Sequence, residues 1–344
     1  MGYYRLFLAT LVIVSHADQI IYFNSGYHIG VSAVISFLLM SGFVMTLLLQ
    51  KYYQSLSSIK GFYFDRILRL MPQYLLYFFA TLFCAYYFGL YHRWMTSFPS
   101  FTSAVLQLAM LPLNFEALFP SDFVVANAWS LGLEGFFYIL FPFVLLFNLR
   151  LPVALFSMAV FLLAYSGVIN TDLWMYRFLP GTFFIFICGS WIANPGTGFG
   201  REIPAMVSII SFILLGITYI DPVLAVPFSR SVLMGIAVGI PIVLALRHQP
   251  KLRFDNLAGD ISYGVFLNQL LVIAILHGLR LDLWKPGEPI PFVLGGSKIW
   301  NPLLTVETFA VAIFASYLTF NLVERPFIKM RRGLRDKIID SDLY

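Results

Sequence analysis

The sequence predicts an all-α membrane protein, a polytopic bundle of about ten transmembrane helices with both the N- and C-termini in the cytoplasm. The composition is 60% hydrophobic and only 11% charged, whereas soluble domains are about 45–50% apolar and about 25% charged. Ten apolar runs approach the length of about 20 residues that an α-helix needs to cross a bilayer. The distribution of Lys and Arg along the chain favours one orientation of these runs.

The ten apolar runs are spread over the whole chain. They fall at 6–23, 29–49, 70–90, 129–148, 152–169, 178–194, 204–220, 229–247, 260–280 and 302–323. A further run at 101–113, bounded by Pro99 and Pro112, is too short to cross a bilayer and is expected to be re-entrant or interfacial. The stretches between the runs are short, so we expect a single transmembrane domain over residues 1–344.

The basic residues support ten spans over eleven. With the N-terminus inside, only six of the 22 Lys and Arg face outward, namely Arg93, Arg177, Arg230, Arg280, Lys285 and Lys298. The cytoplasmic side of a membrane protein carries the excess of positive charge, and an eleventh span would move the basic tail at about 326–344 outside. The tail is therefore expected at the inner membrane surface, and the net charge of +5 does not indicate nucleic-acid binding.

The first apolar run carries ionisable residues at both ends of one stripe. Arg5 and His16 are eleven residues apart, which is about three turns of an α-helix, so both side chains project from the same face. Gln19 lies on that stripe, whereas Asp18 points to nearly the opposite side. A neutral imidazole can take a proton from a hydroxyl near neutral pH. Alternatively, His16 could have a purely structural role in a helix–helix hydrogen bond. Ionisable groups inside membranes are usually functional.

Arg66 and Arg69 share one helical face at the inner end of the third run. Two guanidinium groups on one face suit a ligand rich in phosphate. Basic residues at an inner helix end are also expected from topology alone.

The fourth run brings a carboxylate into the membrane. Glu134 lies about five residues into WSLGLEGFFYILFP, which starts at Trp129 and also contains Tyr138. A carboxylate at this depth requires a partner or a water-filled cavity. Glu134 could orient His16, stabilise its protonated form or hold a hydroxyl of a second substrate. It could also form a structural ion pair or extend toward the membrane interface as a snorkelling group. Trp129 could be an interface anchor.

Three further polar features interrupt apolar runs. Ser41-Gly42 breaks the second run, where glycine could permit close helix approach or leave space for a ligand. Asn268 and Gln269 are expected to be buried amides that join helices. Glu324-Arg325-Pro326 at the end of the last run predicts that the helix stops there. Cys84 and Cys188 lie in apolar runs and indicate neither a disulfide framework nor a metal site.

Taken together, these stretches resemble the acyltransferase-3 family of integral membrane O-acyltransferases, which O-acylate sugars of surface and exported polysaccharides. The resemblance covers nearly the whole chain. Arg5 and His16 match the Arg, ten residues, His pattern of the family, and Arg66 and Arg69 match its RxxR. FLLMSGF is similar to FFxxSGF, WSLGLEGFFYILFP to WSLxxExxFYLLFP, ISYGVFLNQ to ISYxxYLxH, and LVERPF to the closing IExPF.

The resemblance implies an acyl donor, an acceptor and a role for each of the site residues. The donor would be a cytoplasmic acyl-CoA, most often acetyl-CoA, with its phosphates held by Arg66 and Arg69 and with Arg5 near the same mouth. His16 would be the general base on an acceptor hydroxyl or a brief carrier of the acyl group, and Glu134 would tune or orient the site. The remaining residues expected to line the site are Ser41, Trp129, Tyr138 and Gln269. The acceptor would be a glycan or lipid-linked saccharide. The protein would be located in the inner or plasma membrane. The resemblance implies no metal.

The chain departs from the family pattern at three positions. Ile35 stands near where the family often has an acidic residue, Gln269 replaces the histidine of ISYxxYLxH, and Gly135 replaces a second acidic residue after Glu134. These departures bear on acceptor choice more than on donor chemistry. Many members also carry a C-terminal extracytoplasmic hydrolase-like domain; this sequence ends too soon for one, and we expect it to act alone or with a separate protein.

Two other functions are compatible with the residues. A proton-coupled transporter could use His16 and Glu134 as a relay, and a catalytically inactive scaffold would explain Ile35 and Gln269. Only the acyltransferase requires a cationic mouth for phosphate, so the RxxR pair distinguishes it from the transporter.

Overall fold

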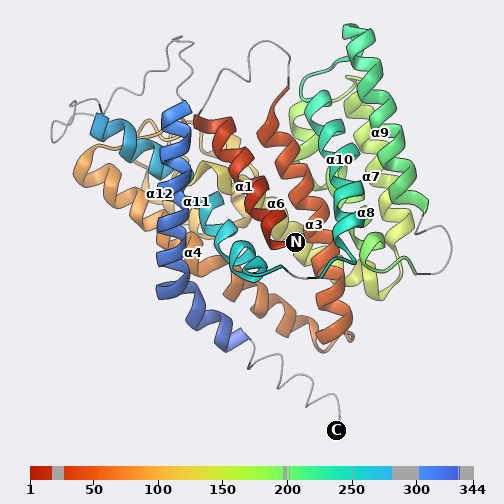
Figure 1. Ribbon diagram of the computed structural model, residues 1–344, viewed down its shortest axis with the longest axis horizontal. Coiled ribbons are helices and arrows are strands. Elements are labelled where there is room, and N and C mark those ends of the chain that lie inside the picture. The colour runs from red at the N-terminus through yellow and green to blue at the C-terminus, as the bar shows by residue number, and fades with distance from the viewer. Residues whose placement is uncertain are drawn as a thin grey trace.

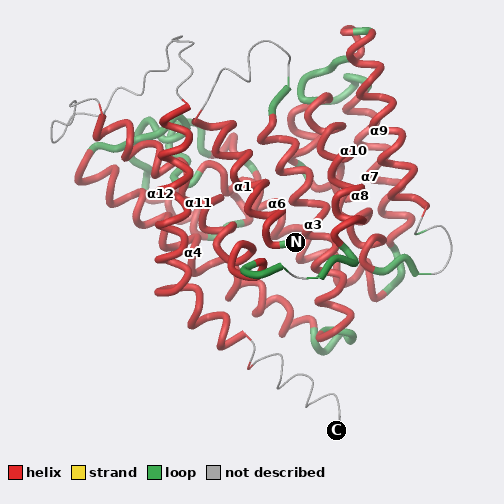
Figure 2. The backbone as a smooth tube through the Cα atoms, in the orientation of Figure 1, coloured by secondary structure: helices red, strands yellow, loops and turns green. Residues whose placement is uncertain are grey.

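The protein folds as a bundle of helices in the computed structural model, which describes residues 1–17, 27–196, 200, 202–250, 252–280, 302–331 and 333. Figure 1 shows the long helices side by side, and Figure 2 shows loops and short turns joining them. The end of the first predicted span, with Asp18 and Gln19, and the tail from 334 onward lie outside the described residues.

Each of the ten predicted runs coincides with a helix. The helices are α1 (Gly2–Ala17), α3 (Ile29–Tyr52), α4 (Ile59–Phe88), α6 (Trp129–Leu146), α7 (Arg150–Tyr165), α8 (Leu179–Ala193), α9 (Glu202–Ile220), α10 (Ser229–Leu246), α11 (Asp255–Arg280) and α12 (Pro302–Thr319). Within the described part of the chain, eight helical stretches are long and apolar enough to cross a membrane. The exceptions are α1 and α7, with 16 residues each. The predicted polytopic helical bundle is confirmed.

The segment 101–113 does not form a long helix. It folds into α5 (Phe101–Leu108) and a single 3-10 turn at Leu111–Asn114. The turn packs against α6, where a Cβ on Gly132 would come within 2.4 Å of the backbone nitrogen of Asn114.

Two helix ends differ from the expectation. α4 begins at Ile59 rather than near residue 70, and its added turns include Asp65 and Arg66, which are both buried. The expected stop at Pro326 was wrong: a π-helical segment, Phe320–Glu324, follows α12, and helix then continues to Arg331. A π-type turn frees the backbone carbonyls that a proline ring would otherwise strike.

The centre of the bundle is formed by α1, which packs between α3 and α11 (Figure 1). α3 in turn contacts α8 and α10, and α11 contacts α12. A Cβ on Gly42 would lie 1.9 Å from the carbonyl oxygen of Phe186, so the backbones of α3 and α8 touch there. The predicted use of Gly42 for close helix approach is confirmed.

Asn268 joins α11 to α12, as the sequence predicted for a buried amide. Its Nδ2 donates to the carbonyl oxygen of Ala312 and to the hydroxyl of Ser316, both at 3.0 Å. This contact fixes the face that α11 turns toward α1, and with it the position of the neighbouring Gln269.

Candidate functional site

The predicted site residues line two cavities, except Gln269, which lines neither. The first, of about 380 Å³, is lined by four arginines and is called here the arginine cavity. The second, of about 360 Å³, is lined by His16 and is called the histidine cavity. Two residues, Val34 and Phe266, line both. α1 serves both cavities, because Arg5 lies near its start and His16 near its end.

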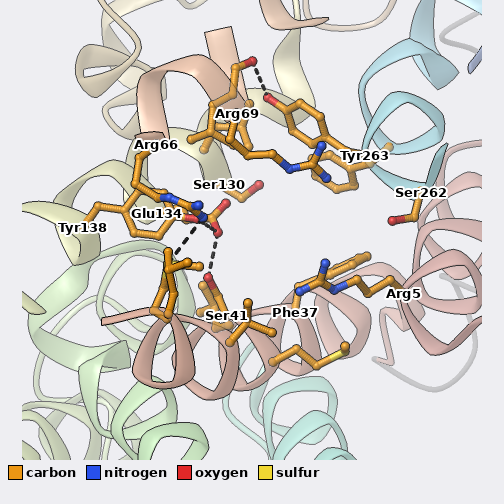
Figure 3. A pocket seen from close by; sticks show the side chains of 18 of the residues that line it. Arg5, Phe37, Ser41, Arg66, Arg69, Ser130, Glu134, Tyr138, Ser262 and Tyr263 are labelled. Carbon is orange, nitrogen blue, oxygen red and sulfur yellow. Dashed lines mark hydrogen bonds between the residues drawn. The ribbon is translucent and has the colours of Figure 1, made fainter. Parts of the chain in front are cut away.

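The arginine cavity gathers guanidinium groups from three separate segments. Arg5 comes from α1, Arg66 and Arg69 from α4, and Arg331 from the helix that continues after the π-helical segment. Figure 3 shows the side chains of Arg5, Arg66 and Arg69 extending toward one common space. The three arginines predicted from the sequence therefore do meet, and Arg331 joins them.

Arg66 and Arg331 are held by one buried carboxylate. Asp65 is fully buried and accepts hydrogen bonds from Nε of Arg66 at 3.0 Å and from Nε of Arg331 at 3.1 Å. The guanidinium of Arg66 also lies 5.8 Å from the centre of the Tyr138 ring. A carboxylate shared by two guanidinium groups reduces the cost of keeping both away from water.

Arg69 has a carboxylate of its own. It forms an ion pair with Glu324 of the π-helical segment, whose side chain is 1% exposed, and its guanidinium lies 5.4 Å from the centre of the Tyr263 ring. Asp65 and Glu324 lie behind the cavity wall and do not line it, whereas Asp260 and Glu134 do. Four guanidinium groups thus face two carboxylates across the cavity. Because each guanidinium has five N–H donors, donors remain for a ligand.

Glu134 belongs to the arginine cavity. Ser41 of α3 donates a hydrogen bond of 2.7 Å to its Oε1, and the Tyr138 hydroxyl, one helical turn along α6, donates to the same oxygen (Figure 3). All three residues line the arginine cavity. Ser41 and Tyr138 were predicted to line the site, and the structure brings them together around the carboxylate.

His16 is oriented by Gln269 rather than by Glu134. Nδ1 of His16 lies 3.2 Å from Oε1 of Gln269. Nε2 of Gln269 donates to the carbonyl oxygen of Phe266 at 2.9 Å, which places the amide oxygen toward the imidazole. An oxygen accepts, so Nδ1 carries the proton and Nε2 of His16 keeps a lone pair.

Aromatic residues from outside the helices enclose the imidazole. The Trp94 ring meets the His16 ring edge to face, with centroids 5.3 Å apart. Trp94 is held by His92, whose Nδ1 accepts from the backbone N–H of Trp94 at 3.3 Å and whose Nε2 donates to the carbonyl of Val124 at 3.0 Å. Burial lowers the pKa of His92 to about 4, so the imidazole is neutral at pH 7, as these two bonds require.

The lining of the histidine cavity also contains an amide and an aromatic–cation stack. Trp129 lines this cavity, and the guanidinium of Arg177 lies 4.9 Å from the centre of its ring. Asn127 is 4% exposed, and its Nδ2 donates to the carbonyl of Phe266. Its Oδ1 has no partner among the described residues.

The structure therefore separates residues that the sequence analysis placed together. Trp129 and Glu134 are close in sequence on α6, yet Trp129 lines the histidine cavity and Glu134 the arginine cavity. The expectation that Glu134 could orient His16 is replaced by the contact with Gln269.

Two of the unusual positions lie away from both cavities. Ile35 is fully buried against Gly235 of α10, where a Cβ would come within 2.8 Å of it. Gly135 faces the 3-10 turn, and a Cβ there would meet Leu111 at 2.8 Å. Neither Ile35 nor Gly135 lines either cavity.

Sequence reasoning missed Arg331 and Asn127. Arg331 was counted as part of a basic tail, and its partner Asp65 lies 266 residues away in the chain. Asn127 precedes the fourth apolar run and belongs to none of the motifs that the sequence analysis used. A polar side chain two residues before Trp129, at the mouth of a span, was the only available clue.

Comparison with known proteins identifies the family. A family model described as an acyltransferase domain, that of the acyltransferase-3 family, matches residues 2–321. An uncharacterized protein of Aquifex aeolicus (strain VF5) is 31% identical over 222 residues, which is 62% of this chain and 93% of that protein. No solved structure matches. The chain belongs to the acyltransferase-3 family of membrane acyltransferases.

Proposed function

We propose that this protein is an O-acyltransferase of the inner or plasma membrane that moves an acetyl group from cytoplasmic acetyl-CoA to a hydroxyl of a surface or exported glycan or of a lipid-linked saccharide. One observation carries the proposal. A cavity lined by four arginines adjoins a second cavity that contains a histidine oriented as a base, and two residues line both.

The donor binds in the arginine cavity. Coenzyme A carries a pyrophosphate and a 3′-phosphate, and guanidinium groups bind phosphate through paired N–H donors. Arg5, Arg66, Arg69 and Arg331 supply these donors, and the distribution of Lys and Arg along the sequence favours a cytoplasmic position for this end of the bundle. The pantetheine arm then leads the thioester toward Val34 and Phe266.

The reaction takes place beside His16. Nε2 of His16 takes the proton of the acceptor hydroxyl while the hydroxyl oxygen attacks the thioester carbonyl carbon. The new C–O ester bond forms, the C–S bond breaks, and the thiolate that leaves receives the proton from His16. Gln269 keeps Nδ1 protonated and the ring in one orientation during these steps, and the unpartnered Oδ1 of Asn127 accepts a hydrogen bond from the acceptor.

Glu134 acts on the donor side. Its carboxylate fixes the hydroxyls of Ser41 and Tyr138 in the wall along which the donor passes. The transporter alternative uses His16 and Glu134 as a proton relay. Their positions in different cavities do not favour such a relay.

The experiment that tests this function measures esterified acetyl groups on cellular glycans. Cells lacking the gene are complemented with wild type, His16→Ala or His277→Ala, and released acetate is quantified with membrane expression of each variant. His277 lies on α11 and bonds the carbonyl of Ile273, outside both cavities. We expect wild type and His277→Ala to restore the esters and His16→Ala to restore none. Equal glycan acetylation with and without the gene would contradict the function.

A further inference from the structure

Val34 and Phe266 lie where the two cavities adjoin. We infer that these two side chains form the passage between the cavities and select the acyl group by its cross-section, so that straight chains pass and branched chains do not. This inference rests on the proposed acyl transfer and names the residues that set its donor specificity.

The junction is lined by two apolar side chains that are almost fully buried. Val34 on α3 and Phe266 on α11 are each only 7% exposed although they line both cavities. Phe37, one turn further along α3, lines the arginine cavity (Figure 3). Its ring meets the Phe266 ring edge to face, with centroids 5.9 Å apart. These side chains are apolar and have no hydrogen-bond donor or acceptor. The size of a group, rather than its hydrogen bonding, therefore decides whether it fits between them.

The backbone at Phe266 is fixed beside the reacting imidazole. Its carbonyl oxygen accepts hydrogen bonds from Gln269, which orients His16, and from Asn127, which lines the histidine cavity. The residue that narrows the passage is thus tied to the residues that form the acceptor side. A group that passes Phe266 enters the cavity that His16 lines.

The order of passage explains why branching matters. The nucleotide of the donor stays with the arginines, so the acyl group enters the junction first and the unbranched pantetheine arm follows. A straight acyl chain needs no wider opening than the arm itself. A methyl branch next to the carbonyl widens the leading group, and close-packed walls accommodate added methyl groups poorly. One methyl group in a fitted site discriminates by about tenfold or more.

The test compares two donors of identical composition, butyryl-CoA and isobutyryl-CoA, together with acetyl-CoA. Purified protein in proteoliposomes is supplied with acceptor glycan, and the ester product of each donor is quantified. Val34→Ala and Phe266→Leu widen the junction, and Val34→Leu narrows it. Val31→Ala and Val44→Ala are matched controls on the same helix, because Val31 lines only the histidine cavity and Val44 only the arginine cavity.

For wild type we expect acetyl transfer to be fastest and butyryl transfer to exceed isobutyryl transfer at least tenfold. Val34→Ala and Phe266→Leu should each reduce the butyryl-to-isobutyryl ratio at least threefold, the two controls should keep the wild-type ratio, and Val34→Leu should slow butyryl transfer more than acetyl transfer. If wild type transfers neither four-carbon group, Val34→Ala should gain butyryl transfer first.

Several results would overturn the inference while leaving the function intact. These are equal transfer of the two isomers by wild type, an unchanged ratio in Val34→Ala, or an equal change of ratio in Val31→Ala or Val44→Ala. Failure of wild type to transfer any acyl group, acetyl included, would instead contradict the proposed function. Melting temperatures of all variants identify any that are misfolded, and Val34→Ala, which removes only two methyl groups, then carries the test.

Discussion

Nδ1 of His16 lies 3.2 Å from Oε1 of Gln269, which stands where the family pattern has a histidine. A residue that cannot itself transfer a proton thus sets the tautomer of the residue that can. Gln269 is in this account a positioning residue, and its effect should fall on turnover rather than on donor binding.

Gln269→Leu keeps the size of the side chain and removes the acceptor for Nδ1–H. We expect kcat to fall about 10- to 100-fold, less than the roughly 10²- to 10⁴-fold that general acid–base catalysis contributes, because His16 itself remains. The KM for acetyl-CoA should not change. Gln269→His restores a nitrogen that can accept and should recover most of the rate. Steady-state kinetics in proteoliposomes check both. A merely structural role would lower the yield of folded protein and would not be rescued by histidine.

Arg331 should contribute to donor binding. Removing its charge with Arg331→Gln deletes N–H donors from the arginine cavity, and charge-assisted hydrogen bonds are worth about 1.5–3 kcal/mol each. We expect the KM for acetyl-CoA to rise at least tenfold with little change in kcat. Arg325→Gln is the matched control, because Arg325 lies on the same helix, is exposed and bonds Asn321. Equal KM values for the two variants would rule out Arg331 as a donor-binding residue.

Asn127 should contribute to acceptor binding. Its Oδ1 is buried in the wall of the histidine cavity without a described partner, so Asn127→Ala removes a ready acceptor of a hydrogen bond. We predict a KM for the acceptor glycan about tenfold higher and an unchanged KM for acetyl-CoA in the same protein. The second value is an internal control, and a change in the donor KM alone would refute the assignment.

His92 should make stability depend on pH. Its folded-state pKa is about 4 and that of an unfolded histidine about 6.5, so the unfolded chain binds more protons between these values. The stabilisation is fully present above about pH 6.5 and is lost as the pH falls toward 4, by about 1.4 kcal/mol per pH unit. The melting temperature should therefore decrease more between pH 7 and pH 5 for wild type than for His92→Gln. Parallel curves would show that His92 does not titrate as described.

The sequence predicted the helical bundle and the cationic cavity because each depends on local patterns. Hydropathy located the ten helices, and spacing placed Arg66 and Arg69 on one face of α4. The relation between His16 and Glu134 depends instead on how α1 and α6 are rotated about their axes against α11, which hydropathy does not determine. Likewise, the pairing of Arg331 with Asp65 joins residues that are 266 positions apart in the chain. It depends on the continuation of the helix past Pro326, which the sequence did not predict.

The central claim is that donor binding and transfer belong to two adjoining cavities. It is tested most directly by measuring, on the same purified variants, the Kd for acetyl-CoA by calorimetry and the rate of transfer in a single turnover. Arg5→Gln should weaken binding at least tenfold, whereas His16→Gln should bind acetyl-CoA as wild type does and transfer nothing. Wild-type transfer by His16→Gln, or a loss of binding in His16→Gln as large as in Arg5→Gln, would contradict the account.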